Sequence, residues 1–254
     1  MTKLSLTLVQ SHLYWENPKK NREHLELLLS ATQQTDLIIL PELFSTAFSV
    51  SCNGEPMNGD SMKWMSSLAK EKKASVVGSL IISENNHKYN RLIWMNADGT
   101  YQYYDKRHLF GMMQEESYFK AGQNRLIVDF NGWKICPLIC YDLRFPVFSR
   151  NNVNFDLMLY VANWPVKRID HWDKLLLARA IENQCYVVGV NRVGQDINEI
   201  EFSGHSSLID YNGHIIYRGI EKEQVKTLVI DKNDLAQGRL RLPFLKDMDS
   251  FTIN

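Results

Sequence analysis

The chain has 254 residues, and its 44% hydrophobic and 23% charged content is typical of a soluble globular protein with a sizeable core. Lys and Arg together number 29, as do Asp and Glu, so the formal net charge is zero. This balance gives no overall field that would attract nucleic acid or a membrane surface, and we expect neither as a partner.

The amino-terminal segment and the cysteines favour a cytoplasmic location. The first ten residues are too short and too regularly alternating for a signal peptide, and no apolar run approaches the roughly 18 residues of a membrane helix. The cysteines lack the spacing of a secreted disulfide framework, which is typical of a reducing compartment. They are Cys52, Cys136, Cys140 and Cys185.

In the first half of the chain, short apolar runs alternate with amphipathic segments. Leu4, Leu6 and Leu8 alternate with polar residues as in a strand, and Asn17 followed by Pro18 is typical of a helix start. The expected elements are strands at residues 4–8, 37–40, 76–82, 92–95 and 101–104, and helices capped by Asn17 and by Asp60.

In the second half, most strands are unbroken apolar runs, as in sheets that are covered on both faces. Pro146 is expected to open a helix. The other expected elements are strands at residues 126–130, 133–140, 156–162, 186–190, 206–209, 215–217 and 228–230, and a helix at 170–184. The sequence therefore predicts an α/β fold in which mixed sheets carry helices on their outer faces, in a single domain over residues 1–254.

Three of the buried strands end in a residue that can do chemistry. Glu42 follows the strand at 37–40, Lys106 follows the strand at 101–104, and Cys140 ends the strand at 133–140. Taken singly, each has an ordinary interpretation as a solvated surface charge or a small core residue. Because the carboxyl ends of parallel strands converge on one sheet edge, we expect the three side chains to meet there.

Together these side chains would form an acyl-transfer site. A free thiol has a pKa of about 8.5, so Cys140 needs a base, and a desolvated Glu42 carboxylate can serve as one. Lys106 and the backbone N–H of Tyr141 can then stabilise the oxyanion of a tetrahedral intermediate. The pattern predicts a Cys-Glu-Lys triad with Cys140 as the nucleophile.

Three segments resemble, in order, the signature blocks of the nitrilase superfamily of carbon–nitrogen hydrolases. They are Leu-Pro-Glu at 40–42, Tyr-Asp-Lys-Arg-His-Leu-Phe at 104–110 and Ile-Cys-Tyr-Asp-Leu-Arg-Phe-Pro at 139–146. The resemblance implies a four-layer αββα sandwich and a homodimer, and it implies the same three roles for Glu42, Lys106 and Cys140. It also implies a second catalytic glutamate after the lysine block, for which Glu116 fits better than the adjacent Glu115.

Within this superfamily, the Asn163-Trp164-Pro165 stretch and the compact length look most like the bacterial omega-amidase branch. Those enzymes hydrolyse the terminal amide of α-keto acids such as α-ketoglutaramate. Such a substrate carries a carboxylate, so a cation should meet its far end.

The candidate substrate-binding residues are Phe48, Asn163, Trp164 and Arg144, with Lys167, Arg168 and Arg192 as further candidate cations. Arg144 has a structural alternative, which is to pair with Asp142 or Glu182.

Other kinds of site are less well supported. Cys136 and Cys140 lie four residues apart in a strand, about 13 Å, whereas zinc ligands lie about 2.3 Å from the metal. The glycines form no nucleotide-binding motif, and we expect neither a metal nor a cofactor. The remaining alternatives are an N-carbamoyl-amide or nitrile hydrolase with the same triad, and a catalytically inert binding protein on this fold.

Overall fold

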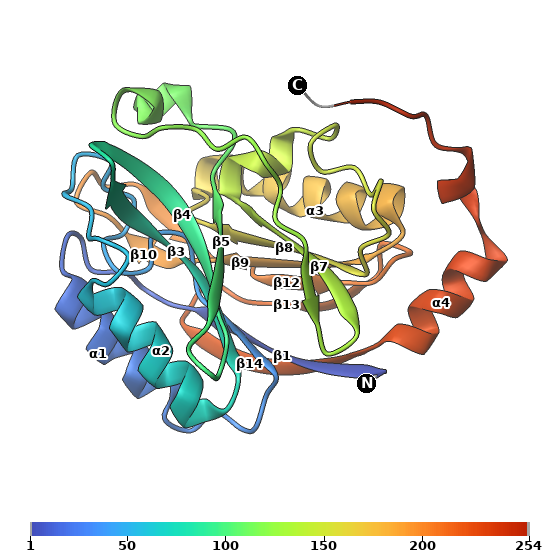
Figure 1. Cartoon of the computed structure of the whole chain (residues 1–254), viewed down its shortest axis with the longest axis horizontal. Helices are drawn as coiled ribbons and strands as arrows, with labels where there is room; N and C mark the ends of the chain where they lie inside the picture. Colours follow the sequence, from blue (N-terminus) through green and yellow to red (C-terminus); the bar gives the residue numbers. More distant parts are fainter. Residues whose placement is uncertain (1, 253–254) are drawn as a thin grey trace.

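The computed structural model describes residues 2–252 and has two six-stranded sheets at its centre (Figure 1). The strands of the first sheet are β1 (Lys3–Gln10), β2 (Leu37–Ile39), β3 (Ser75–Glu84), β4 (His87–Met95), β5 (Tyr101–Asp105) and β14 (Gln224–Asp231). Those of the second are β6 (Val128–Phe130), β7 (Trp133–Ile139), β8 (Leu157–Ala162), β9 (Tyr186–Asn191), β12 (Ser207–Ile209) and β13 (Ile215–Arg218). The orders are β14-β1-β2-β3-β4-β5 and β13-β12-β9-β8-β7-β6.

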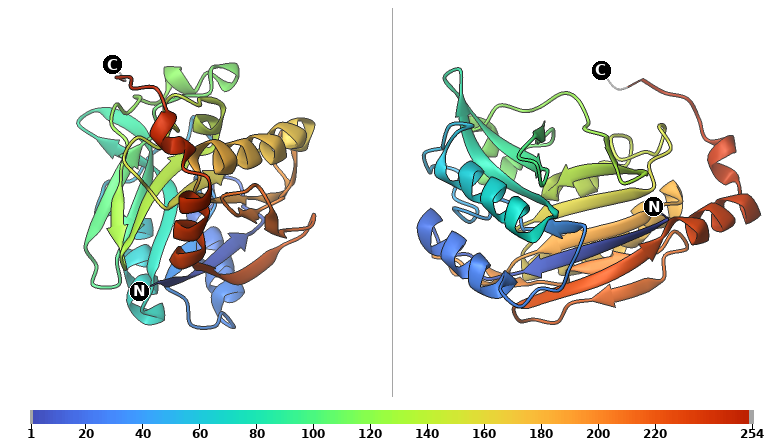
Figure 2. Two further views of the ribbon diagram at one scale, coloured as in Figure 1. Left: turned by 90° about the vertical axis from the view of Figure 1, so that its right-hand side faces the viewer. Right: turned by 60° about the horizontal axis from the view of Figure 1, so that its bottom comes forward.

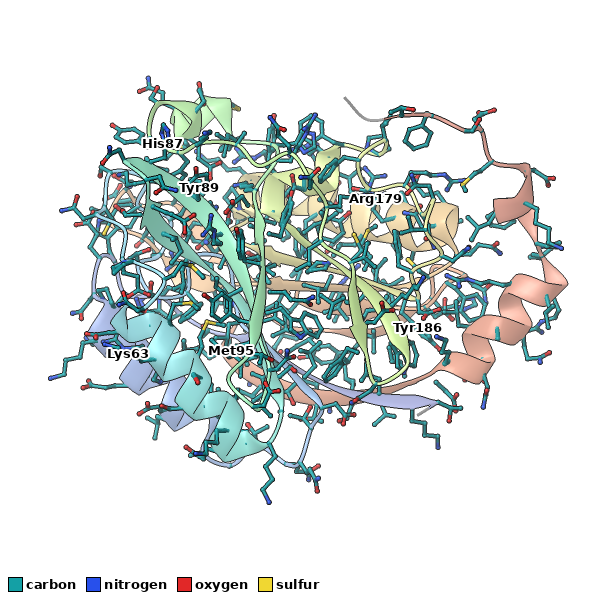
Figure 3. All side chains as sticks on the ribbon, viewed as in Figure 1. Lys63, His87, Tyr89, Met95, Arg179 and Tyr186 are labelled. Carbon is teal, nitrogen blue, oxygen red and sulfur yellow. The ribbon has the colours of Figure 1, made fainter. Side chains whose placement is uncertain are left out.

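Helices cover the outer faces of both sheets. They are α1 (Pro18–Leu29) and α2 (Asp60–Lys72) on the first sheet and α3 (Ile169–Asn183) on the second. Figure 2 shows α3 on the opposite side of the molecule from α1 and α2, and Figure 3 shows side chains filling the space between the layers. The expected αββα sandwich is therefore confirmed.

The alternation of side chains along the strands explains this layering. In β2, Leu37 and Ile39 belong to the apolar cluster between the two sheets, whereas Ile38 packs with residues of α1 and α2. Burying one such side chain stabilises the fold by roughly 1.5–3 kcal/mol, so both faces of the strand contribute. This double coverage is why the strand is apolar at every position.

Strand direction brings the ends of several strands to one end of the sandwich. β1, β2 and β3 run parallel to one another, and β5 has the same direction because two antiparallel pairings separate it from β3. In the second sheet, β7, β8 and β9 are parallel. The segments that follow β2, β5, β7 and β8 can therefore meet.

Some elements differ from the expectation. Gly59, and not Asp60, is the N-cap of α2, and Asp60 begins the helix. Pro146 opens no helix, because the chain forms a 3-10 turn at Cys140–Arg144 that closes with an N–H bond from Phe145 to Asp142.

The hairpin of β10 (Val193–Gln195) and β11 (Glu201–Ser203) was not predicted, nor was α4 (Lys232–Arg241). These strands have three residues each, and α4 buries only Leu235 and Gly238, so neither carries a clear apolar period. Within residues 2–252, no helix is long and apolar enough to cross a membrane.

Candidate active site

Cys140 lies at a strained turn directly after β7. Its φ is +41°, in the left-handed region where a non-glycine residue costs about 1–3 kcal/mol. The buried Asp142 carboxylate holds this turn: it accepts the Ile139 N–H at 3.0 Å and the Tyr104 hydroxyl at 2.8 Å. Its other oxygen accepts the backbone N–H of His108 at 3.1 Å. The turn that presents the thiol is thus tied to the segment that carries Lys106.

Lys106 follows β5 and is held between two buried carboxylates. Its Nζ lies 2.9 Å from Glu42 Oε1 and 2.9 Å from Glu115 Oε2. Asn90 of β4 binds the same two groups, with Nδ2 donating to Glu42 Oε1 at 2.9 Å and to Glu115 Oε1 at 3.1 Å. Burial opposes the charge on Lys106, but Glu115 and Glu42 outweigh it and raise its pKa above the usual lysine value, so it stays protonated.

Glu115 has a pKa raised above the usual glutamate value. Burial is the main cause, the Lys106 ammonium opposes it, and the Glu42 carboxylate adds to it. Glu115 also accepts the Phe110 N–H at 2.7 Å, which fixes the carboxylate against the lysine.

The second oxygen of Glu42 is held by Asn163, the residue that follows β8. Glu42 Oε2 accepts the backbone N–H of Asn163 at 2.9 Å, and Asn163 Nδ2 donates to the Glu42 carbonyl at 2.7 Å. Cys140 contacts this carboxylate, and burial, followed by the charge of Glu42, raises the pKa of the thiol well above its usual range, while Lys106 opposes the shift. The resting group is therefore a thiol beside a base, and it must lose its proton as it attacks.

The three predicted residues come together, but not at one sheet edge as expected. Glu42 and Lys106 follow strands of the first sheet, and Cys140 follows a strand of the second. Asn163, which follows β8, joins the two sheets through its bonds to Glu42. The site is therefore built across the interface between the sheets.

A solvent-open hollow of about 580 Å³ leads to Cys140 and Lys106. Tyr141 and the four predicted binding residues, Phe48, Asn163, Trp164 and Arg144, all line it. Four further lining residues with apolar side chains were not expected from the sequence: Phe110, Met113, Ile200 and Phe202. Phe110 closes the block at 104–110, and nothing in the local sequence pattern of the other three residues indicates a place in a site.

Of the two adjacent glutamates, Glu115 and not the expected Glu116 lies against Lys106. Glu115 is fully buried against Lys106, whereas Glu116 is exposed on the same 3-10 turn, Glu115–Ser117. Gln114 precedes the turn with a φ of +52°, and this left-handed residue turns Glu115 inward. Asn90 was also missed, because a polar residue before the apolar run at 92–95 reads as a strand end.

The structure divides the candidate cations. Arg144 and Arg168 line the hollow, whereas Lys167 is exposed outside its lining. Arg192 lies behind Phe202, with its guanidinium carbon 4.5 Å from the centre of that ring and Nη2 donating to a backbone carbonyl at 2.9 Å. Burial lowers the pKa of Arg192 to about 10.

The structural alternative for Arg144 does not occur. Asp142 binds Tyr104 and His108, and Glu182 pairs with Arg179 at 2.7 Å. Within the described part of the chain, no three His, Cys, Asp or Glu side chains are grouped so that they could hold a metal ion.

Comparison with known proteins extends these findings. Residues 5–239 match the family model described as carbon-nitrogen hydrolase. An omega-amidase of Yersinia enterocolitica is 41% identical over the full length of both chains, and a 2-oxoglutaramate amidase of Bacillus subtilis is 32% identical over 97% of this chain and 98% of its own. A crystal structure of a CN-hydrolase superfamily protein from Xanthomonas campestris, which has an arsenic adduct in its active site, matches with a TM-score of 0.97 and 43% identity, covering 100% of both chains.

Proposed function

Because the chain belongs to the carbon–nitrogen hydrolase family, we propose that it is an omega-amidase that hydrolyses the terminal amide of 2-oxoglutaramate to 2-oxoglutarate and ammonia. The relatives described as omega-amidase and 2-oxoglutaramate amidase support this substrate. The observation that carries the chemistry is the contact of one carboxylate, Glu42, with both the Cys140 thiol and the Lys106 ammonium.

In the first half of the reaction, Glu42 accepts the proton of Cys140 while the sulfur attacks the amide carbon. The carbonyl oxygen becomes an oxyanion, which the Lys106 ammonium and the Tyr141 N–H stabilise. The carbon–nitrogen bond then breaks, and Glu42 gives its proton to the leaving nitrogen. Ammonia departs, and the acyl group remains on Cys140 as a thioester.

In the second half, Glu42 takes a proton from water, and the resulting hydroxide attacks the thioester carbon. The carbon–sulfur bond breaks, the thiolate recovers the proton from Glu42, and the free acid leaves. We assign to Glu115, in place of Glu116, the role of holding Lys106 and balancing its charge, because Glu115 is the buried partner of the lysine.

Ammonia release from a substrate panel tests the assignment. We expect kcat/KM to be highest for 2-oxoglutaramate among that compound, glutamine, an N-carbamoyl amino acid and a simple nitrile. Preference for the carbamoyl compound or the nitrile would instead indicate an N-carbamoyl-amide hydrolase or a nitrile hydrolase. Absence of turnover with every compound would favour an inert binding protein.

Replacement of the nucleophile tests the covalent step. Cys140→Ala should lower kcat by at least about 10³-fold, because the thioester route is lost. Rapid acid quenching of the wild-type enzyme during turnover, followed by mass spectrometry, should detect the acyl group on the peptide that contains Cys140. Turnover without this adduct, or a Cys140→Ala variant with normal kcat, would contradict the mechanism.

We further infer a cytoplasmic enzyme that works as a homodimer and forms a single carbon–nitrogen hydrolase domain over residues 1–254. The apolar cluster that joins both sheets and α3 supports the single domain. Residues 1, 253 and 254 of that range lie outside the described residues.

A further inference from the structure

Two arginines, Arg144 and Arg168, line the hollow. Arg144 ends the 3-10 turn that begins at Cys140, and its guanidinium carbon lies 4.6 Å from the centre of the Trp164 ring. Arg168 ends the next 3-10 turn, Val166–Arg168, with its guanidinium carbon 5.3 Å from the centre of the Phe110 ring. Stacking on aromatic rings favours a cation and limits the positions that its planar group can adopt.

Neither guanidinium has a counter-ion in the described part of the chain, where no carboxylate lies within 4.0 Å of either one. Arg144 Nη1 instead lies 3.2 Å from Nδ1 of His171. Among the described lining residues Asp196 alone is acidic, and its Oδ1 accepts the backbone N–H groups of Asn198 at 2.8 Å and Ile200 at 3.0 Å.

The two arginines also repel each other. Burial, followed by the charge of Arg168, lowers the pKa of Arg144 below the usual arginine value. Two positive charges that share a partly desolvated wall without an anion are unfavourable in the free protein, and an anionic ligand would relieve the repulsion.

The reactive end of the hollow has the opposite character. There, Lys106 is shared between the carboxylates of Glu42 and Glu115, so this cluster has no excess positive charge with which to bind the carboxylate of a ligand. A ligand with a carboxylate at one end and a neutral amide at the other can therefore bind favourably in one direction, with the amide at Cys140.

We propose that Arg144 and Arg168 together bind the carboxylate of the substrate at the end remote from the scissile amide. The inference rests on the proposed amidase function and narrows its substrates to ω-amides of short-chain acids that carry a free carboxylate. A guanidinium matches the two oxygens of a carboxylate, and two of them provide donors on both sides. Phe48, Ile200 and Phe202 line the hollow and suit a short methylene chain.

A matched pair of substrates isolates the carboxylate. Glutaramate and pentanamide have the same chain and the same amide, but glutaramate ends in a carboxylate where pentanamide ends in a methyl group. We expect the wild-type enzyme to have a kcat/KM on the order of 100-fold higher for glutaramate, since each charge-assisted hydrogen bond contributes about a factor of ten or more.

Variants of the two arginines locate the effect. Arg144→Gln and Arg168→Gln should each raise KM for glutaramate roughly 10- to 100-fold and leave KM for pentanamide nearly unchanged. Arg168→Lys should recover part of the loss, because it restores the charge without the planar fork. Lys167→Gln is the matched control, since this exposed neighbour lies outside the hollow lining and should change neither value.

Binding of glutarate gives a measurement that is independent of catalysis. In a Cys140→Ala background, calorimetry should detect glutarate binding, weakened roughly 10- to 100-fold by Arg144→Gln or Arg168→Gln. Equal activity of the wild-type enzyme on glutaramate and pentanamide, or glutarate affinity that neither arginine affects, would overturn the inference while the amidase function stood. If no amide is hydrolysed, the proposed function fails, and arginine-dependent glutarate binding would still support the anion subsite.

Discussion

At the scale of single residues, the site depends on the balance of charge around Lys106. One ammonium is buried between two carboxylates, and a fourth group, the Asn90 amide, donates to both carboxylates. Removing one member of a buried cluster leaves the others unpaired, which costs more than an exposed ion pair contributes. We therefore expect even an isosteric replacement of any one of these side chains to lower the activity.

Replacing Glu115 tests this balance directly. Glu115→Gln keeps the shape but removes one negative charge and places an amide donor beside the Lys106 ammonium. We expect kcat for 2-oxoglutaramate to fall by about 10²-fold or more, the size of effect seen when a preorganised electrostatic group is lost. Glu116→Gln changes the neighbouring exposed residue in the same way and should retain nearly full activity. Equal losses in the two variants would contradict the assignment of Glu115.

The raised pKa values also set the pH range of activity. The reaction needs a protonated Lys106 and a thiol beside a carboxylate, and both Lys106 and Cys140 have a raised pKa, so they keep their protons as the pH rises. We therefore expect no alkaline loss of kcat/KM below about pH 10.

Glu115 sets a limit on the acid side. An ordinary glutamate has a pKa of about 4.3. Because the pKa of Glu115 is raised, this residue takes up a proton at a higher pH than an ordinary glutamate does. We therefore expect kcat/KM to decline as the pH falls, in a pH profile taken between pH 5 and 10.5. An alkaline limb near pH 8.5 would show that the thiol ionises normally and would refute this account.

At the scale of elements, the turn after β7 depends on one buried carboxylate. Asp142 accepts bonds from Ile139, Tyr104 and His108, and thereby holds Cys140 at its positive φ. Strain of this kind persists only where surrounding contacts determine the backbone.

Asp142→Asn should disrupt this turn, because an amide cannot accept at both positions and its NH₂ would face donors. We expect the free energy of unfolding in urea to fall by about 2–4 kcal/mol and kcat to fall with it. Asp129→Asn, an exposed change in β6, is the control and should alter unfolding by less than about 0.5 kcal/mol. A stable, fully active Asp142→Asn enzyme would show that the turn holds without this carboxylate.

The sequence predicted those elements whose apolar period is complete. The strands buried on both faces were found, and so was the place of Glu42, Lys106 and Cys140 directly after three of them. The contact of Glu115, rather than Glu116, with Lys106 was not predicted, because it depends on the left-handed backbone at Gln114, which a sequence pattern does not report. The assembly of the site from two sheets was also missed, since local patterns carry no information on which strands pair.

At the scale of the whole molecule, α4 and the segment after it extend beyond the end of the sandwich (Figures 1 and 2). Residues of the tail and of the segment that follows the Cys140 turn together form an exposed apolar surface. Val147 is 58% exposed, Phe244 40% and Phe251 37%, and the three line one shallow hollow. A surface of this kind is typical of a contact between subunits.

We expect the proposed homodimer to use this surface. Light scattering should give twice the chain mass of 29.6 kDa for the wild-type protein, and Phe244→Asp should shift the mass toward that of one chain. Ile216→Asp changes an equally exposed apolar residue on β13 and should leave the dimer intact. A wild-type monomer, or a Phe244→Asp variant that remains a dimer, would rule out this arrangement.

Because the site is divided between the two sheets, catalytic activity depends on how the two sheets pack against each other. The sulfur and its proton acceptor share no strand, so a slight slip between the layers separates them while each sheet remains hydrogen-bonded within itself. Ammonia production should therefore cease at lower urea concentrations than those that abolish the far-ultraviolet circular dichroism. After storage or mutation, a loss of activity would therefore report a change in the packing between the two sheets before circular dichroism reports any unfolding.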